Sequence, residues 1–197
     1  MLNPEEINFY INQFKGLELT DVFELFKLSQ TRKLAVGEVY IAEGSNYQKL
    51  AFIKKGLIRS YLLKENGDEI TLMIRWENQF LASHDSIIHQ RPSRFTYQAL
   101  EDTVLMEIDY HKAQPIIDHS SKLSKTRNNL LLQMLSDSMY RVENFILLSA
   151  EERYLKLVQE KPDIINRVPD KYLATMLGIT PVSLSRIRKR IASSSKH

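Results

Sequence analysis

The sequence predicts an α+β protein: an N-terminal antiparallel β-roll, a long helix and a C-terminal helix-turn-helix. Three segments lead to this prediction. Residues 31–110 are short β-rich runs separated by glycines, residues 120–148 repeat apolar side chains at helical spacing, and residues 169–191 carry two helical patterns around a glycine. Their order predicts three domains, over residues 1–118, 119–148 and 149–197.

The composition is that of an ordinary globular protein without cysteine. At 197 residues, with 43% hydrophobic and 26% charged residues, the chain can form one large domain or two small ones. The absence of cysteine excludes disulfides, cysteine zinc sites and cysteine-ligated iron–sulfur clusters. No apolar run reaches bilayer length and no signal-peptide pattern is present, so we expect a cytoplasmic protein without a membrane partner.

Positive charge is concentrated toward the C-terminal end. Seven Lys or Arg residues and one Asp lie from Arg167 onward, which gives this end a net charge of +6. The whole chain carries +3, so residues 1–166 carry −3. Charge gathered in one small module is typical of a nucleic-acid binder.

The N-terminal half predicts two short helices followed by the roll. Residues 4–30 begin with Pro4 and two glutamates and place phenylalanines at helical spacing, with a break near Gly16. The β-rich runs that follow are short and closely spaced, which favours a small antiparallel roll or barrel. Between two of these runs, Asn66 and Gly67 predict a hairpin with a primed two-residue turn.

The middle of the chain predicts a short helix and a long one. Asp109 is a candidate cap for a helix through Ile117, and the long helix is expected from about Ser120 to Leu148. An apolar seam with alternating spacings of four and three runs along it: Leu131, Leu135, Ser138, Val142 and Phe145. A neighbouring stripe is also apolar, so this helix needs two partners. We expect these to be its own roll and the same helix of a second chain; burial of both stripes within one chain is the alternative.

Residues 149–197 predict a compact three-helix module. Ser149 and Glu152 match a capping box, and Pro162 ends the helix that they start. Any wing strand must come from residues 161–169, because the second helix of the helix-turn-helix is followed directly by His197.

Residues 169–191 carry the helix-turn-helix pattern. Gly178 takes the left-handed conformation that ends a helix, and Thr180 is a good N-cap residue. Pro181 follows at the first helical position, where its missing N–H costs nothing. Leu184, Ile187 and Ile191 then form a buried stripe and leave the basic residues on other faces. This arrangement suits the DNA major groove; an ordinary helical hairpin with a solvated basic end is the alternative.

The run LATMLGITPVSLSRIRKRI resembles the helix-turn-helix of the Crp–Fnr transcription regulators. Their cyclic-nucleotide-binding roll and long helix occur in the same order, so the resemblance covers nearly the whole chain. It implies a homodimer joined through the long helix and double-stranded DNA as partner, with an inverted-repeat operator. RNA polymerase is a further candidate partner. The missing cysteines exclude the oxygen sensing of some family members.

The resemblance places two side chains on DNA base edges. Arg186 aligns with a base-reading arginine, and Val182 stands where many relatives have a glutamate. Val182 can touch a thymine methyl but cannot accept a hydrogen bond from cytosine. The other predicted DNA contacts are to phosphates. The full set is Lys171, Thr180, Val182, Ser183, Arg186, Lys189 and Arg190.

The expected effector cassette departs from the family pattern. Relatives carry a Gly-Glu pair for the ribose and an Arg followed by Ser or Thr for the phosphate; here Ala82–Ser83 and Ser93–Arg94 stand at those places. Binding of cyclic AMP in the usual mode is therefore not expected. Candidate ligands for another anion, whose identity the sequence does not give, are Ser83, Ser86, Arg91, Ser93 and Arg94. A polar surface loop with solvated arginines is the favoured alternative.

The sequence thus predicts a DNA-binding transcription regulator and not an enzyme. No phosphate-binding glycine loop and no hydrolase or zinc-protease motif is present. His84 and His89 have no neighbours that complete a metal site, so no metal and no cofactor are expected. Two alternatives remain: a cyclic-nucleotide-responsive regulator with a rearranged pocket, and a protein-interaction adaptor that does not bind DNA.

Overall fold

The structure is a computed structural model that describes residues 25 and 27–194. The short helices predicted within residues 4–30 fall largely outside the described residues. The strands are β1 (Ser29–Leu34), β2 (Val39–Ile41), β3 (Lys49–Lys55), β4 (Ile58–Leu63), β5 (Glu69–Arg75), β6 (Phe80–Leu81), β7 (Thr96–Ala99) and β8 (Thr103–Asp109). The helices are α3 (His84–Ile87), α4 (Tyr110–His119), α5 (Ser121–Leu147), α6 (Ala150–Glu160), α7 (Ile164–Arg167), α8 (Asp170–Met176) and α9 (Pro181–Ser194).

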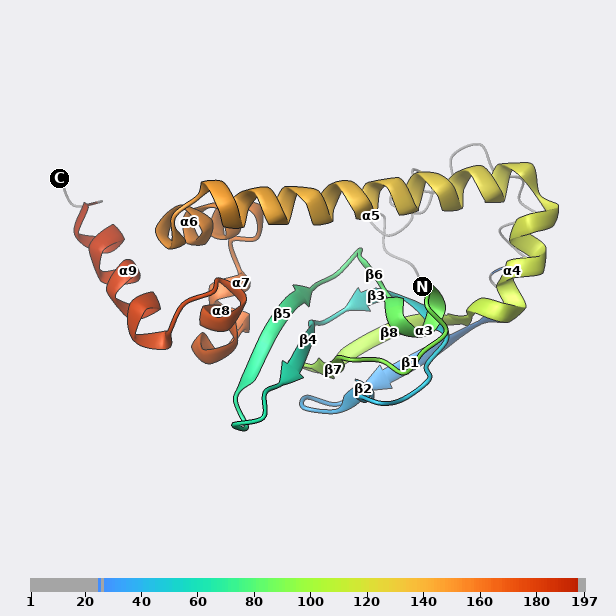
Figure 1. Ribbon diagram of the computed structural model, residues 1–197, viewed down its shortest axis with the longest axis horizontal. Helices are drawn as coiled ribbons and strands as arrows, with labels where there is room; N and C mark the ends of the chain where they lie inside the picture. The colour runs from blue at the N-terminus through green and yellow to red at the C-terminus, as the bar shows by residue number, and fades with distance from the viewer. Residues whose placement is uncertain (1–24, 26, 195–197) are drawn as a thin grey trace.

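The strands form a roll of two four-stranded antiparallel sheets, in the orders β1-β8-β3-β6 and β2-β7-β4-β5. Figure 1 shows α5 running along the roll, with α4 at one end and α6 to α9 at the other. Alternate positions of β8 point inward, and Leu105 lies in the core with Ile53 and Ile58. The predicted fold class, with its roll, long helix and C-terminal helices, is confirmed.

The predicted hairpin joins β4 to β5, but the prediction of its turn was wrong. The Lys64 N–H donates to the Asp68 carbonyl at 2.9 Å, and the Gly67 N–H donates to the Lys64 carbonyl at 2.9 Å. These bonds close a three-residue loop. A primed turn needs positive φ at both Asn66 and Gly67, but only Gly67 has it, at 86°. The Asn66 side chain instead accepts from the Asp68 N–H at 3.1 Å, and this bond stabilises the three-residue loop.

The predicted cap of the short middle helix and the predicted start of the long one are confirmed. Asp109 accepts from the Lys112 N–H at 3.2 Å and starts α4, which continues two residues past the predicted end. Ser120 caps α5 through the Leu123 N–H at 3.3 Å. Leu123 is buried, so this end of α5 is packed within the chain.

The C-terminal helices share a core with one end of the roll. Leu57 and Ile74 of the roll pack with Tyr154, Leu173 and Leu184 of the helices. Because this core crosses the predicted boundary at 149, the helices are docked on the roll instead of standing apart. The domain bounds 1–118, 119–148 and 149–197 stay predictions.

Two arginines reinforce this docking. The Arg59 side chain is 1% exposed, and its guanidinium lies 3.9 Å from the Tyr61 ring centroid and 3.6 Å from that of Tyr172 on α8. Arg167 of α7 pairs with Glu77 of the roll at 2.5 Å. The pKa of Arg167 is raised, because it donates hydrogen bonds to Glu101 and Glu77.

Residues 161–169, the stretch from which any wing strand would have to come, contain the helical turn α7 and no strand. Ile164 and Val168 are both buried, and their spacing of four places them on one helical face. Asp163 and Arg167 also pair at this spacing, at 2.8 Å. The capping box that starts α6 is confirmed: Ser149 and Glu152 accept from each other's backbone N–H. No helix in the described part of the chain is long and apolar enough to cross a membrane.

Candidate nucleic-acid interface

The turn between α8 and α9 has the predicted geometry. Gly178 has a φ of 73°, a left-handed conformation that glycine adopts without strain. Its N–H donates to the Thr175 carbonyl, and the Ile179 N–H donates to the Ala174 carbonyl, each at 3.0 Å. These two bonds form the Schellman motif that ends a helix. Thr180 Oγ1 then accepts from the Ser183 N–H at 3.2 Å and starts α9.

The packing of α8 against α9 fixes which side of α9 faces outward. Leu173 and Ala174 on α8 and Leu184 on α9 have no exposed surface, and Ile187 is 5% exposed. Ala174 is small enough to let the two helices approach. The opposite side of α9 therefore lies in solvent.

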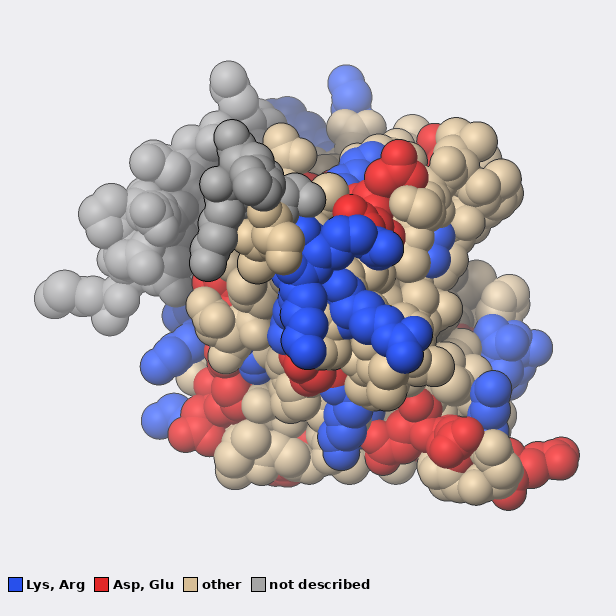
Figure 2. Space-filling view, turned by 90° about the vertical axis from the view of Figure 1, so that its left-hand side faces the viewer, with Lys and Arg blue, Asp and Glu red and all other residues tan. Residues whose placement is uncertain are grey.

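The exposed side of α9 carries Val182, Arg186 and Lys189, at spacings of four and three. Val182 is 61% exposed. Neither Arg186 nor Lys189 has an ion-pair partner among the described residues. Figure 2 faces this end of the molecule, and Lys and Arg side chains gather at its centre with acidic ones around them. Ser185 is exposed on the same side; its position three residues after Val182 was a signal that the sequence analysis missed.

The other predicted phosphate contacts are placed less uniformly. Thr180 is exposed and its hydroxyl lies 3.0 Å from that of Ser183, so both already serve the N-cap of α9. Lys171 is exposed at the start of α8, with its ammonium 4.6 Å from a tyrosine ring centroid. Arg190 pairs with Glu151 at 2.6 Å. Lys171 therefore remains available for DNA, whereas Arg190 must first leave a carboxylate.

The predicted effector residues surround a carboxylate that the sequence analysis did not single out. Asp85, on α3, is 3% exposed. Its Oδ1 accepts from Arg91 Nε at 2.9 Å and Nη2 at 2.7 Å, and its Oδ2 accepts from the Arg94 backbone N–H at 3.1 Å. Arg94 Nε lies 3.1 Å from both oxygens. The two arginines therefore already hold an anion, and it belongs to the chain itself.

The three serines of the cassette are also used internally. Ser83 and Ser86 are buried, and Ser83 Oγ accepts from the Ser86 N–H at 3.3 Å as the N-cap of α3. Ser93 is 2% exposed and donates to the Phe95 carbonyl at 2.8 Å. Arg91 and Arg94 are exposed, at 49% and 64%, as the expectation of a surface loop with solvated arginines has it. The loop differs from that expectation in its buried serines and in the buried Asp85 that both arginines contact.

Asp85 is ionised at neutral pH. Burial alone opposes ionisation, but the hydrogen bonds from Arg91 and Arg94 outweigh it and lower the pKa to about 2. Asp85 thus presents a permanent negative charge to the arginines.

The predicted seam on α5 is largely exposed. Leu131 is 49% exposed, Leu135 57%, Val142 56% and Phe145 46%, and the hydroxyl of Ser138 bonds back to the helix at 2.8 Å. No described segment of the chain covers this stripe, which argues against burial of both stripes within one chain. Within the described ranges, no cluster of three or more His, Cys, Asp or Glu side chains could hold a metal ion.

Comparisons with known proteins identify the same architecture. The cyclic nucleotide-binding domain family matches residues 31–120. The chain is 26% identical over 202 residues to the fumarate and nitrate reduction regulatory protein of Vibrio cholerae, covering 95% of this chain and 77% of that protein. It is 25% identical over 203 residues to electron transport regulator A of Shewanella oneidensis, with the same coverage.

Solved structures share the fold. FixK2 from Bradyrhizobium japonicum superposes with a TM-score of 0.72 at 12% identity, over 85% of this chain and 86% of that one. A putative regulator of the Crp–Fnr family from Eubacterium rectale superposes with a TM-score of 0.70 at 21% identity, over 93% and 88%.

The fold and the exposed α9 face define a class: a β-roll joined by a long helix to a DNA-binding helix-turn-helix. The relatives in sequence are regulators and not enzymes, in agreement with the sequence analysis. Residues 31–120 of the chain match the cyclic nucleotide-binding domain family, and the relatives that the whole chain resembles in sequence are regulatory proteins.

Proposed function

We propose that the protein is a homodimeric, sequence-specific DNA-binding transcription regulator. The observation that carries the proposal is the solvent-facing side of α9, where Val182, Arg186 and Lys189 are exposed and the two cations lack ion-pair partners among the described residues. Two such helices, related by a twofold axis, suit successive major grooves of an inverted repeat. The cytoplasmic location and the contact with RNA polymerase stay predictions.

Within this interface we assign base reading to Arg186 and Val182 and phosphate contacts to Lys171, Lys189 and Arg190. The hydroxyls of Thr180 and Ser183 already take part in the N-cap of α9, so only the hydrogen bonds that these hydroxyls do not make there are left for a phosphate. Phosphate contacts give affinity that depends on salt but not on sequence.

A salt titration with fluorescently labelled mixed-sequence duplex DNA tests DNA binding. We expect the binding constant to fall as salt rises, and Lys189→Ala to reduce the slope of this dependence by about 1. The matched control is Lys64→Ala, which removes a lysine from the exposed β4–β5 hairpin. Absence of salt-sensitive affinity, or equal weakening by both variants, would contradict the proposal and favour the adaptor.

The dimer assignment rests on the exposed seam of α5. Leu135→Glu places a charge on it, and we expect the dimer dissociation constant, measured by analytical ultracentrifugation, to rise by about 100-fold or more. Gln133→Glu adds the same charge to an exposed position of α5 outside the seam and serves as control. Dimers of unchanged stability in Leu135→Glu would place the interface elsewhere.

We further propose that the roll does not bind cyclic AMP in the usual mode, which puts the chain in a branch of the family with a degenerate cassette. Asp85 occupies Arg91 and Arg94 with its own charge, at the place where a ligand phosphate is expected from the resemblance. Calorimetry with cyclic AMP and cyclic GMP tests this. Micromolar binding of either nucleotide would contradict it and favour the rearranged-pocket alternative.

A further inference from the structure

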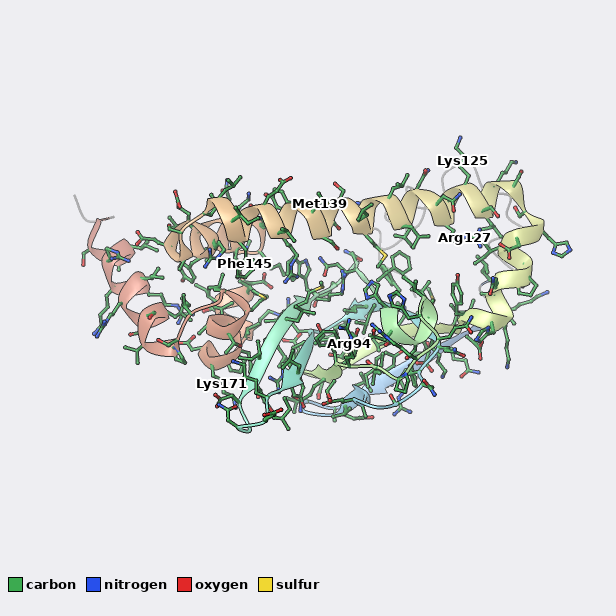
Figure 3. All side chains as sticks on the ribbon, viewed as in Figure 1. Arg94, Lys125, Arg127, Met139, Phe145 and Lys171 are labelled. Atoms are coloured by element: carbon green, nitrogen blue, oxygen red, sulfur yellow. The ribbon has the colours of Figure 1, made fainter. Side chains whose placement is uncertain are left out.

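A cavity of about 150 Å³ lies where three parts of the chain meet. Its wall includes Trp76 directly after β5, Phe145 on α5, and Leu177 directly after α8. It also lies next to the helix-turn-helix turn, because a Cβ added at Gly178 would be 3.1 Å from the Phe145 ring. Figure 3 shows Phe145 at the end of α5 that faces the C-terminal helices. A molecule in this cavity therefore contacts the roll, the long helix and the DNA-binding helices together.

Three cationic side chains line the cavity: Arg141, Arg153 and Lys156. Each donates only to neutral acceptors among the described residues. The bonds are Arg141 to the Leu72 carbonyl at 2.5 Å, Arg153 to the Leu148 and Leu177 carbonyls at 2.6 and 2.9 Å, and Lys156 to Asn144 Oδ1 at 2.9 Å. The one carboxylate in the lining, Glu160, accepts from the Tyr140 hydroxyl at 3.3 Å. The lining is therefore net positive.

Two of these cations, Arg141 and Arg153, are partly buried without an opposite charge beside them in the described part of the chain, and the guanidinium of Arg153 lies 4.6 Å from the Phe145 ring centroid. Arg153 Nε is buried and has no hydrogen-bond partner. Burial lowers the pKa of Arg141, and the charge of Arg75 lowers it further. Buried charge without an opposite charge is costly. An anion in the cavity would compensate it and give the free N–H of Arg153 an acceptor.

The rest of the cavity wall is apolar, so it favours a ligand with an apolar part. Trp76 and Phe145 offer aromatic surface, and Leu157 and Met176 offer aliphatic surface. A dry cavity of about 150 Å³ is large enough to hold benzene. Inorganic phosphate alone would leave this apolar surface unfilled.

We infer that this cavity binds a small organic anion: one carboxylate or phosphate group on an apolar body about the size of a benzene ring. The anionic group faces Arg141, Arg153 and Lys156, and the apolar body packs on Trp76. By joining the long helix to the DNA-binding helices, the ligand changes the affinity for DNA. This second, regulatory part rests on the proposed function, whereas the binding site does not.

The single tryptophan of the chain makes the test direct, because Trp76 fluorescence reports from the cavity wall. The probes are benzoate and phenyl phosphate, which distinguish the two anionic groups. Benzyl alcohol lacks the charge and inorganic phosphate lacks the apolar body. We expect a saturable change with at least one of the two organic anions. Benzyl alcohol should bind about tenfold more weakly, since a charged hydrogen bond contributes about 1.5–3 kcal/mol. Inorganic phosphate should also bind about tenfold more weakly, because it leaves the apolar wall of the cavity uncovered.

Variants locate the binding. Lys156→Gln removes one charge at a partly exposed position, and we expect about tenfold weaker binding of the anion. Leu157→Phe keeps every charge but fills space, and we expect it to abolish binding. Lys125→Gln, near the opposite end of α5 in Figure 3, leaves binding unchanged. The inference is overturned if neither organic anion binds, if benzyl alcohol binds equally well, or if Lys156→Gln and Leu157→Phe both bind like the wild type.

The regulatory part is read in the same titration with labelled duplex DNA present. We expect the bound anion to change DNA affinity by about fivefold or more. A change in Trp76 fluorescence without any change in DNA affinity would contradict the regulatory part of the inference and would leave the binding site supported. Absence of DNA affinity with and without the anion would contradict the proposed function. The fluorescence of Trp76 would still show whether the anion binds in the cavity.

Discussion

Two pairs of cations in this chain differ in what holds them. Arg91 and Arg94 in the roll share the buried carboxylate of Asp85, at distances of 2.7 to 3.1 Å. Arg186 and Lys189 on α9 have no ion-pair partner among the described residues. Figure 3 labels Arg94 in the roll, and Figure 1 shows α9 at the C-terminal end of the molecule, outside the roll. Paired arginines therefore indicate a binding site for an external anion only where no carboxylate of the chain already pairs with them, as Asp85 does with Arg91 and Arg94.

The largest effect is expected at α9. Arg186→Ala should weaken binding to the preferred DNA site by about 1–3 kcal/mol and relax specificity at one base pair, because arginine bonds guanine with two hydrogen bonds. Fluorescence anisotropy with single-base variants of the site measures this. Arg94→Ala is the matched control and should leave DNA affinity unchanged. Uniform weakening across all sequences would instead place Arg186 on the phosphate backbone.

Val182→Glu should change which base the protein prefers. A carboxylate accepts from the amino group of cytosine, whereas valine touches only a thymine methyl, and such pairs discriminate by about 1–3 kcal/mol. Selection from random duplexes with both proteins measures the preference. The idea fails if the variant returns the same half-site as the wild type.

The effect expected from the roll is on folding and not on DNA binding. Asp85→Asn should lower the free energy of unfolding at neutral pH by about 1–3 kcal/mol, because it removes charged hydrogen bonds in a buried place. The pKa of Asp85 is lowered in the folded state to about 2, so its contribution is fully present above its unfolded pKa of about 3.9 and is lost as the pH falls toward 2.

Urea unfolding of both proteins across this pH range provides the measurement. The stability difference between wild type and Asp85→Asn should be constant at higher pH and should shrink below pH 4. A difference that persists at pH 2, or none at neutral pH, would show that the carboxylate does not hold the arginines as described.

What the sequence predicted well was local. The Gly178–Thr180–Pro181 turn, the Ser149–Glu152 capping box and the Asp109 cap each depend on residues within a few positions of one another. Their backbone hydrogen bonds can therefore be inferred from the residue types alone. The exposed side of α9 followed from the same reasoning, because the buried stripe of a helix determines its opposite side.

What the sequence did not predict was long-range. The role of Asp85 depends on α3 folding its carboxylate under a loop that returns six to nine residues later. The helical turn α7 forms where a wing strand was the open possibility, because Ile164 and Val168 pack in a core shared with the roll. The cavity next to Trp76 needs three segments that only the tertiary fold brings together. Neither spacing nor composition carries this information.

The central claim is that α9 offers its free cations to DNA while the roll has no need of a cyclic nucleotide. The most direct test is selection of bound DNA from a random duplex pool with the purified protein, without ligand, at near-physiological salt. We predict an enriched inverted repeat whose half-sites lie about one helical turn apart. Failure to enrich any sequence without ligand, followed by enrichment once cyclic AMP or cyclic GMP is added, would contradict the claim.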